Sequence, residues 1–310
     1  MAAVTSAMVK ELRERTSAGM MDCKKALVES DGDMDKAVEY LREKGLAASQ
    51  KKAGRIAAEG IACAGNFDGV GVAVEVNSET DFVAKNEKFI EFAKGVAATV
   101  AKENPADLEA LLACKYNGTD LTVEQQQQEM VLVIGENIKV RRFARYDSGM
   151  NVPYVHMGGR IGVIVNLDVS EGLESNETVQ ELAKDIAMQI AALNPAYLDK
   201  ETVPAEVVEH EKSIMMVQIN EDPKNASKPD AIKEKMIIGK INKYYTEVCL
   251  MQQPFVKDDK VSVEKHVAEV AKQVGGTIKV NAYTRFERGE GIEKKQDNFA
   301  EEIASMVAGK

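Results

Sequence analysis

The apolar positions of the first 45 residues are spaced for three short helices. Thr5 is suited to cap the first helix. A second helix is predicted from about residue 20 to residue 30. Asp33 can cap a third helix, for which Gly45 is a suitable end. Since three helices this short enclose only a small core, residues 1–54 are predicted to form a small domain with a polar linker from 47 to 60.

The middle of the chain contains an internal repeat with a period of 90 to 91 residues. Three blocks recur: 86–94 in 176–184, 104–108 in 194–198, and 71–74 in 162–165. Each copy reads as a β-rich stretch followed by a helix of about 15–18 residues that ends at Asn-Pro. Further strands are predicted at 138–146 and 277–286. The repeat therefore predicts two related α+β halves with antiparallel sheets.

Between residues 204 and 248 the apolar spacing becomes heptad-like. The positions concerned are Val207, Val208, Ile214, Met215 and Ile219 before Pro223, and Ile237, Ile241, Tyr244 and Val248 after Pro229. Two such helices joined by a proline-bounded turn predict an antiparallel coiled-coil hairpin that protrudes from the second half.

The last segment predicts a separate helical module. Asp297 can cap a helix that carries Phe299, Ile303 and Met306 on one side, after a Gly-Glu-Gly turn. Together the patterns predict an α+β fold in four parts. These are a three-helix domain of the ubiquitin-associated type with its linker (1–54), a first core half (55–146), a second core half with the hairpin 204–248 (147–288), and a C-terminal module (289–310).

Composition narrows the classes of function. The 310 residues are 45% hydrophobic and 29% charged, which is ordinary for a folded protein too long for one compact core. A net charge of −10 argues against binding nucleic acid through its phosphates. The sequence shows no secretion signal, no bilayer-length apolar run, and four scattered cysteines. We therefore expect a cytoplasmic protein that does not bind nucleic acid or membranes directly.

Motif fragments that resemble active sites lack essential members. Gly239-Lys240 has neither the upstream glycine nor the Ser/Thr of a phosphate-binding loop. His210-Glu211 has Ile214 where a zinc protease needs its second histidine. The three histidines lie far apart in the sequence. We expect no active site, metal or cofactor on this chain.

The repeat provides an internal comparison for residues 78–85. The first copy contains Thr80-Asp81-Phe82, whereas residues 169–175 of the second copy contain no aromatic residue. If the second copy folds without Asp81 and Phe82, folding does not require them. In one interpretation Thr80 caps the helix, Asp81 lies at its positive end and Phe82 joins the core. In the other, Phe82 is a wedge for a groove on a partner protein.

These residues resemble a known family. Thr80-Asp81-Phe82-Val83-Ala84-Lys85-Asn86 is similar to the signature of the bacterial elongation factor Ts family, and so is the segment 9–27. Similar blocks follow in order at 135–138, at His156 with 160–163, at 253–256, and at 285–287 with 289–293. The resemblance covers essentially the whole chain and agrees with the four predicted parts.

The resemblance implies a guanine-nucleotide exchange factor that binds elongation factor Tu in its GDP-bound and nucleotide-free forms. In the family an Asp-Phe pair intrudes between helices of the partner's GTPase domain. By this resemblance Phe82 would be the wedge, flanked by Thr80 and Val83, and Asp81 would disturb the partner's Mg²⁺ and phosphate site. Because Mg²⁺ requires near-octahedral geometry, a small displacement there would weaken GDP binding.

The resemblance also implies contacts from the N-terminal domain and from the second half. Arg13, Met20 and Met21 would touch the GTPase domain, although either methionine could instead fill a core. His156 would contact another domain of the partner. Its alternative is an ordinary loop histidine.

The C-terminal module would add a further contact. By the same resemblance Phe299, Ile303 and Met306 would pack on the GTPase domain. Without the resemblance, the same helix would be interpreted as a cap of the core.

Two other classes of function remain. A structural adaptor would use the N-terminal domain and the coiled coil to bridge proteins without exchange activity. An enzyme could use Asp81 and Lys85 for acid–base chemistry, although their spacing also suits an ordinary i,i+4 salt bridge. The coiled coil could also support self-association.

Overall fold

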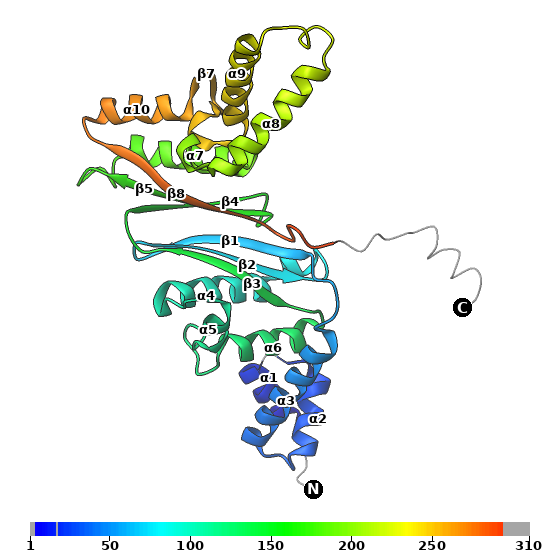
Figure 1. Ribbon diagram of the computed structural model, residues 1–310. Helices are drawn as coiled ribbons and strands as arrows, with labels where there is room; N and C mark the ends of the chain where they lie inside the picture. Colours follow the sequence, from blue (N-terminus) through cyan, green and yellow to red (C-terminus); the bar gives the residue numbers. More distant parts are fainter. Residues whose placement is uncertain (1–3, 17, 294–310) are drawn as a thin grey trace.

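The chain folds into layers that follow one another along one axis, as the computed structural model shows (Figure 1). The structure describes residues 4–16 and 18–293. Within these residues the layers are a three-helix unit, a group of helices, two three-stranded sheets, and a second group of helices that carries a helical hairpin. The predicted α+β class with antiparallel sheets is confirmed. The predicted helix with Phe299, Ile303 and Met306 lies outside the described residues.

The N-terminal unit consists of the predicted three helices, α1 (Ser6–Thr16), α2 (Met20–Glu29) and α3 (Met34–Lys52). Thr5 caps α1, because its hydroxyl accepts a hydrogen bond from the Met8 amide at 3.3 Å. The Asp33 carboxylate caps α3 through two backbone amides. Leu12, Cys23 and Leu27 lie in the small core between the helices.

The predicted end of the third helix at Gly45 is wrong. Helix α3 continues to Lys52, so the first part of the predicted linker (47–52) is helical, and the first strand begins at Glu59. A Cβ on Gly45 would lie 3.2 Å from the carbonyl oxygen of Gln128 in helix α6 (Val123–Ile134). Gly45 therefore allows α3 to pack closely against the core.

The two core halves share the order strand, strand, helix, helix, strand, with additional elements between the two helices of each half. The first half contains β1 (Glu59–Phe67), β2 (Val70–Ser78), α4 (Glu87–Glu103), α5 (Leu108–Ala113), α6 and β3 (Lys139–Tyr146). The second contains β4 (Met150–His156), β5 (Ile161–Val169), α7 (Glu177–Leu193), α10 (Val263–Val274) and β8 (Ile278–Glu287). The sheets are antiparallel, in the orders β1-β2-β3 and β4-β5-β8.

Matching details confirm the predicted repeat. Asn86 and Asn176 cap α4 and α7 with their side chains, and Asn104 and Asn194 end these helices with φ of 47° and 45°. Both sheets also have a bulge at equivalent positions in their central strands, between Glu75 and Val76 and between Asn166 and Leu167.

The repeat extends further than the three recurring sequence blocks. Helices α6 and α10 are each 12 residues long and end at glycines with positive φ, Gly135 and Gly275. Each is followed by the third strand of its half. In this part of the repeat, equivalent residues are 140 positions apart, because the second half contains the inserted hairpin.

The two sheets pack face to face, with each hydrophobic core on the outer side. Val72, Val74 and Val76 of β2 face the helices of the first half, while Glu75 and Asn77 are buried on the opposite side. Strands β1 and β2 contact β4 and β5. Buried polar residues therefore lie between the halves.

The predicted hairpin consists of α8 (Ala205–Glu221) and α9 (Asp230–Val248), which project beyond α7 (Figure 1). Its helices pack through Val208, Met215, Met216, Ile219, Met236, Ile237, Ile241 and Tyr245. Tyr245 replaces the predicted Tyr244 in this contact, and Ile214 is exposed.

Smaller elements complete the described chain. They are the 3₁₀ turns η1 (Val83–Lys85), η2 (Lys200–Thr202) and η3 (Leu250–Gln252), and the strand pair β6 (Pro254–Phe255) and β7 (Asp258–Ser262). Among the helices of residues 4–16 and 18–293, none is long and apolar enough to cross a membrane.

Candidate partner-binding site

Phe82 is the most exposed large apolar side chain in the described part of the chain, with 79% of its surface accessible. It lies in the segment 78–85 between β2 and α4, which we call the Phe82 loop. Asp81 is exposed beside it. The structural interpretation of Phe82 as a core residue is therefore wrong.

The second half shows which residue of the loop belongs to the core. The amide of Asn86 donates to the Val83 carbonyl at 2.9 Å, and the amide of Asn176 donates to the Leu173 carbonyl at 3.0 Å. Val83 is thus equivalent to Leu173, and both pack against the core of their half. The position of Phe82 corresponds to exposed Gly172.

Val83 therefore does not offer an exposed contact. Only 7% of its surface is accessible, since its side chain closes the core beneath the loop. Of the four expected contact residues in the Phe82 loop, Asp81 and Phe82 are exposed and Thr80 is half-buried.

A single carboxylate holds the loop from the α6–β3 turn. Glu136 Oε2 accepts hydrogen bonds from the amides of Glu79 and Thr80 at 3.0 Å each, and Oε1 accepts one from the Thr80 hydroxyl at 2.6 Å. Charged acceptors make the stronger class of hydrogen bond. The backbone just before Asp81 is therefore fixed from a segment distant in sequence.

A second set of contacts joins the same loop to the end of the N-terminal unit. The Glu79 carboxylate accepts from the Asn137 amide at 2.6 Å and lies 3.4 Å from the Arg55 guanidinium. The Asn137 side chain donates to the Arg55 carbonyl at 2.7 Å. The stretch that follows α3, the Phe82 loop and the α6–β3 turn thus meet at one junction.

Thr80 and Asp81 have other roles than those expected for helix capping. Asn86 caps α4, so the expectation that Thr80 caps this helix is wrong. Asp81 forms an exposed ion pair with Lys85 at 3.7 Å. Exposed pairs of this kind are weak, so Asp81 can exchange Lys85 for another contact at little cost.

The N-terminal residues gather at a second place. Arg13, Met20 and Met21 line one hollow of about 600 Å³ between α1 and α2. Met20 and Met21 are 60% and 72% exposed, so neither fills the core. An adaptable apolar pair beside a cation is typical of a protein-binding surface.

His156 ends β4 and is half-buried. Its Nδ1 lies 2.9 Å from the Tyr154 hydroxyl. The turn that follows contains Met157, which is 65% exposed and was not among the residues predicted from the sequence.

The sequence also did not predict the contacts of Arg55, Glu79 and Glu136 at the Phe82 loop, since no motif links positions so far apart in the chain.

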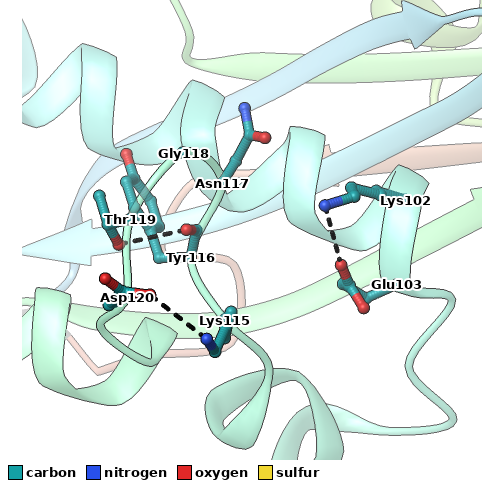
Figure 2. Close-up of a pocket in the computed structure, with 8 residues that line it drawn as sticks. All are labelled: Lys102, Glu103, Lys115, Tyr116, Asn117, Gly118, Thr119 and Asp120. Atoms are coloured by element: carbon teal, nitrogen blue, oxygen red, sulfur yellow. Dashed lines mark hydrogen bonds and ion pairs between the residues drawn. The ribbon is translucent and has the colours of Figure 1, made fainter.

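Another hollow lies beside the end of α4. Figure 2 shows a polar hollow of about 440 Å³ lined by Lys102, Glu103, Lys115, Tyr116, Asn117, Gly118, Thr119 and Asp120. Its lysines are paired with acids, Lys115 with Asp120 at 3.3 Å and Lys102 with Glu103 at 3.4 Å (Figure 2). An anion would have to compete with these pairs.

The thiols of Cys63 and Cys249 have raised pKa values. Burial raises the pKa of the Cys63 thiol to about 12 and that of Cys249 to about 11, so both remain protonated at neutral pH. No group of three or more His, Cys, Asp or Glu residues that could hold a metal ion occurs within residues 4–16 and 18–293.

Comparisons with known proteins agree with this arrangement. The family model described as Elongation factor TS matches residues 79–290. Proteins named Elongation factor Ts from Syntrophotalea carbinolica and Clostridium perfringens are 50% and 52% identical to the chain, over 98% of its length and 99% of theirs. The protein of that name from Magnetococcus marinus is 46% identical, over 99% of this chain and all of its own. The chain therefore belongs to the elongation factor Ts family.

Proposed function

We propose that this protein is a guanine-nucleotide exchange factor for elongation factor Tu and has no active site of its own. One observation carries the proposal: the ring of Phe82 is 79% exposed on a loop that polar contacts hold in place. The second half of the core has a glycine, Gly172, at the equivalent position. An exposed aromatic side chain on an ordered loop suits insertion into a partner, because such residues dominate interface energies.

In the proposed mechanism Phe82 enters a groove between helices of the partner's GTPase domain. Asp81 would then approach the shell of residues that supports the Mg²⁺ ion. Because Mg²⁺ needs near-ideal octahedral geometry, a small shift of this shell weakens its binding and that of the phosphates it bridges. GDP is then released faster.

The exposed Met20, Met21 and Arg13 would form a second contact with the same GTPase domain, and His156 a third contact with another domain. Phe299, Ile303 and Met306 would contribute a fourth contact with the GTPase domain. Several contact points supply binding energy that need not come from the wedge itself. The coupling is reciprocal, so GDP weakens the binding of this protein by the same factor by which this protein weakens GDP.

The test is the release of a fluorescent GDP analogue from purified elongation factor Tu, followed by stopped flow with and without this protein. We expect strong acceleration by the native chain. Phe82→Ala should reduce it by roughly thirtyfold, since truncating a central interface aromatic costs about 2 kcal/mol. Glu171→Ala, which changes an exposed side chain in the equivalent loop of the other half, should leave the rate unchanged.

Unaltered GDP release with the native protein would reject the proposal. If the protein still bound elongation factor Tu in that case, the adaptor function would take its place.

The helical hairpin exposes apolar side chains that could support self-association. Its seam is filled by its own two helices, but Val217, Ile232 and Ile238 remain exposed on it. We propose that exposed apolar side chains of the hairpin, with Ile238 at 61% exposure, can join two copies. Sedimentation velocity should show a dimer that Ile238→Glu dissociates, and a monomer at all concentrations would reject this proposal.

A further inference from the structure

We infer that Glu136 is a positioning residue for exchange, which fixes the Phe82 loop through Glu79 and Thr80. This inference rests on the proposed function. Its basis is a comparison of the two halves: Glu136 ties the loop of the first half, and the shorter equivalent loop of the second half has no such contact.

Each half ties this loop to a residue just before its third strand, Asn137 two residues before β3 and Thr277 one residue before β8. In the second half the Thr277 amide donates to the Ser170 hydroxyl at 2.8 Å, and the Ser170 amide donates to the Thr277 carbonyl at 3.0 Å. In the first half the equivalent Asn137 amide donates to the Glu79 carboxylate at 2.6 Å. This basic tie is therefore part of the fold.

The contacts of Glu136 are additional to this tie. The residue equivalent to Glu136 is Gly276, which directly follows the αL glycine after α10 as Glu136 follows the one after α6. Glycine has no side chain, so the second half forms its loop without any of the three hydrogen bonds that Glu136 accepts. The loop of the second half, 170–175 against 79–85 in the first, is one residue shorter and is held without such a carboxylate.

The extra contacts coincide with the exposed ring. The half with Gly276 has Gly172 at the loop tip, and the half with Glu136 has Phe82 there. The bonds of Glu136 end at Thr80, two residues before Phe82. We therefore assign to the Glu136 carboxylate the role of fixing the orientation in which the Phe82 ring meets the partner.

The expected effect of losing Glu136 follows from populations. A loop that samples several conformers presents Phe82 in the competent orientation in only a fraction of the molecules. The rate of GDP release is reduced to that fraction. The other proposed contacts still hold the partner. The maximal rate of GDP release at saturation should therefore fall more than the half-saturating concentration rises.

The experiment compares Glu136→Ala, Glu136→Gln and Ser170→Ala in the full-length protein. Amide hydrogen exchange at Glu79 and Thr80 is measured first, and it needs no partner. Stopped-flow release of fluorescent GDP from elongation factor Tu then gives the maximal rate and the half-saturating concentration for each variant.

Glu136→Ala should expose both amides and lower the maximal rate about tenfold, equivalent to about 1.4 kcal/mol. Glu136→Gln keeps a neutral acceptor oxygen and should recover part of the loss. Ser170→Ala removes the hydroxyl that accepts from Thr277 in the loop of the second half, and it should leave the Glu79 and Thr80 amides and the rate unchanged. The melting temperature by circular dichroism shows whether each variant is folded.

Two results would overturn the inference: unchanged protection of the Glu79 and Thr80 amides in Glu136→Ala, or freed amides with an unchanged maximal rate. If the native protein itself fails to accelerate GDP release, the proposed function fails, and with it the role of Glu136 in exchange. Freed amides would then still establish that Glu136 orders the loop.

Discussion

At the scale of single residues, Phe82 and Val83 are adjacent apolar side chains in opposite environments. Phe82 is 79% exposed, and Val83 is 7% exposed within the core of the first half. Val83 begins a 3₁₀ turn and packs against the core of the first half, and the equivalent Leu173 packs against the core of the second half. The ring of Phe82 thus contributes little to the fold and is available for contact.

These environments predict opposite effects on stability. Val83→Ala should lower the free energy of unfolding by about 2 kcal/mol, because it removes buried apolar surface and leaves a cavity. Phe82→Ala should change it by less than about 0.5 kcal/mol, as is usual for exposed positions. Urea denaturation followed by circular dichroism measures both. A large loss for Phe82→Ala would mean that the ring packs on its own chain.

At the scale of elements, the contact between α3 and α6 decides how the N-terminal unit is attached. Helix α3 passes Gly45 without a break and packs its last turns on the first half, where Ala48 joins the hydrophobic core. Its C-terminal end leads directly to Arg55, which pairs with Glu79 beside the Phe82 loop. The unit with Met20 and Met21 is therefore held by a packed helix.

Two helical glycines provide a matched pair for this interface. Gly45→Leu should lower the melting temperature and weaken the α3–α6 contact, because its Cβ would lie 3.2 Å from the Gln128 carbonyl and overpacking costs about 1–3 kcal/mol. Gly239→Ala in α9, where a Cβ meets nothing within 4 Å, should instead stabilise by up to about 1 kcal/mol.

Thermal unfolding and amide exchange in α3 test this pair. Equal gains in stability for both substitutions would contradict a close approach of α3 and α6.

At the scale of the whole molecule, buried charges join the two halves. Glu75 is fully buried between the sheets and accepts hydrogen bonds from Arg141 at 3.0 Å, Arg142 at 2.5 Å and the Gly289 amide at 2.7 Å. Arg142 also donates to the Glu287 carbonyl at 3.2 Å. The end of the second half is thereby anchored to the first.

Glu75→Ala should therefore be strongly destabilising, by about 3–5 kcal/mol. It removes the buried carboxylate that compensates the charges of Arg141 and Arg142. Glu75→Gln should cost less, since it retains hydrogen-bonding groups. Asn166→Ala alters the equivalent, uncharged position of the second half and should also cost less.

Urea denaturation monitored separately in the two halves by amide exchange would measure these losses. A loss below about 1 kcal/mol for Glu75→Ala would show that the halves do not depend on this contact.

The sequence by itself determined the features that depend on neighbouring residues. Caps such as Thr5 and Asp33 and the spacing of apolar positions predicted most elements and the duplication, because helix ends and face periodicity are local properties. The resemblance of residues 80–86 to the elongation factor Ts family is likewise carried by consecutive residues alone.

Only the tertiary structure decided which side chains are exposed, since burial depends on elements distant in the chain. Gly45 is a typical helix end in sequence, but the backbone of α6 makes it a packing position. Thr80 is a plausible cap, but Glu136, 56 residues away, takes its hydroxyl. Phe82 is likewise exposed because the neighbouring Val83 occupies the position in the core. The local sequence pattern does not indicate which of these two adjacent apolar residues is buried.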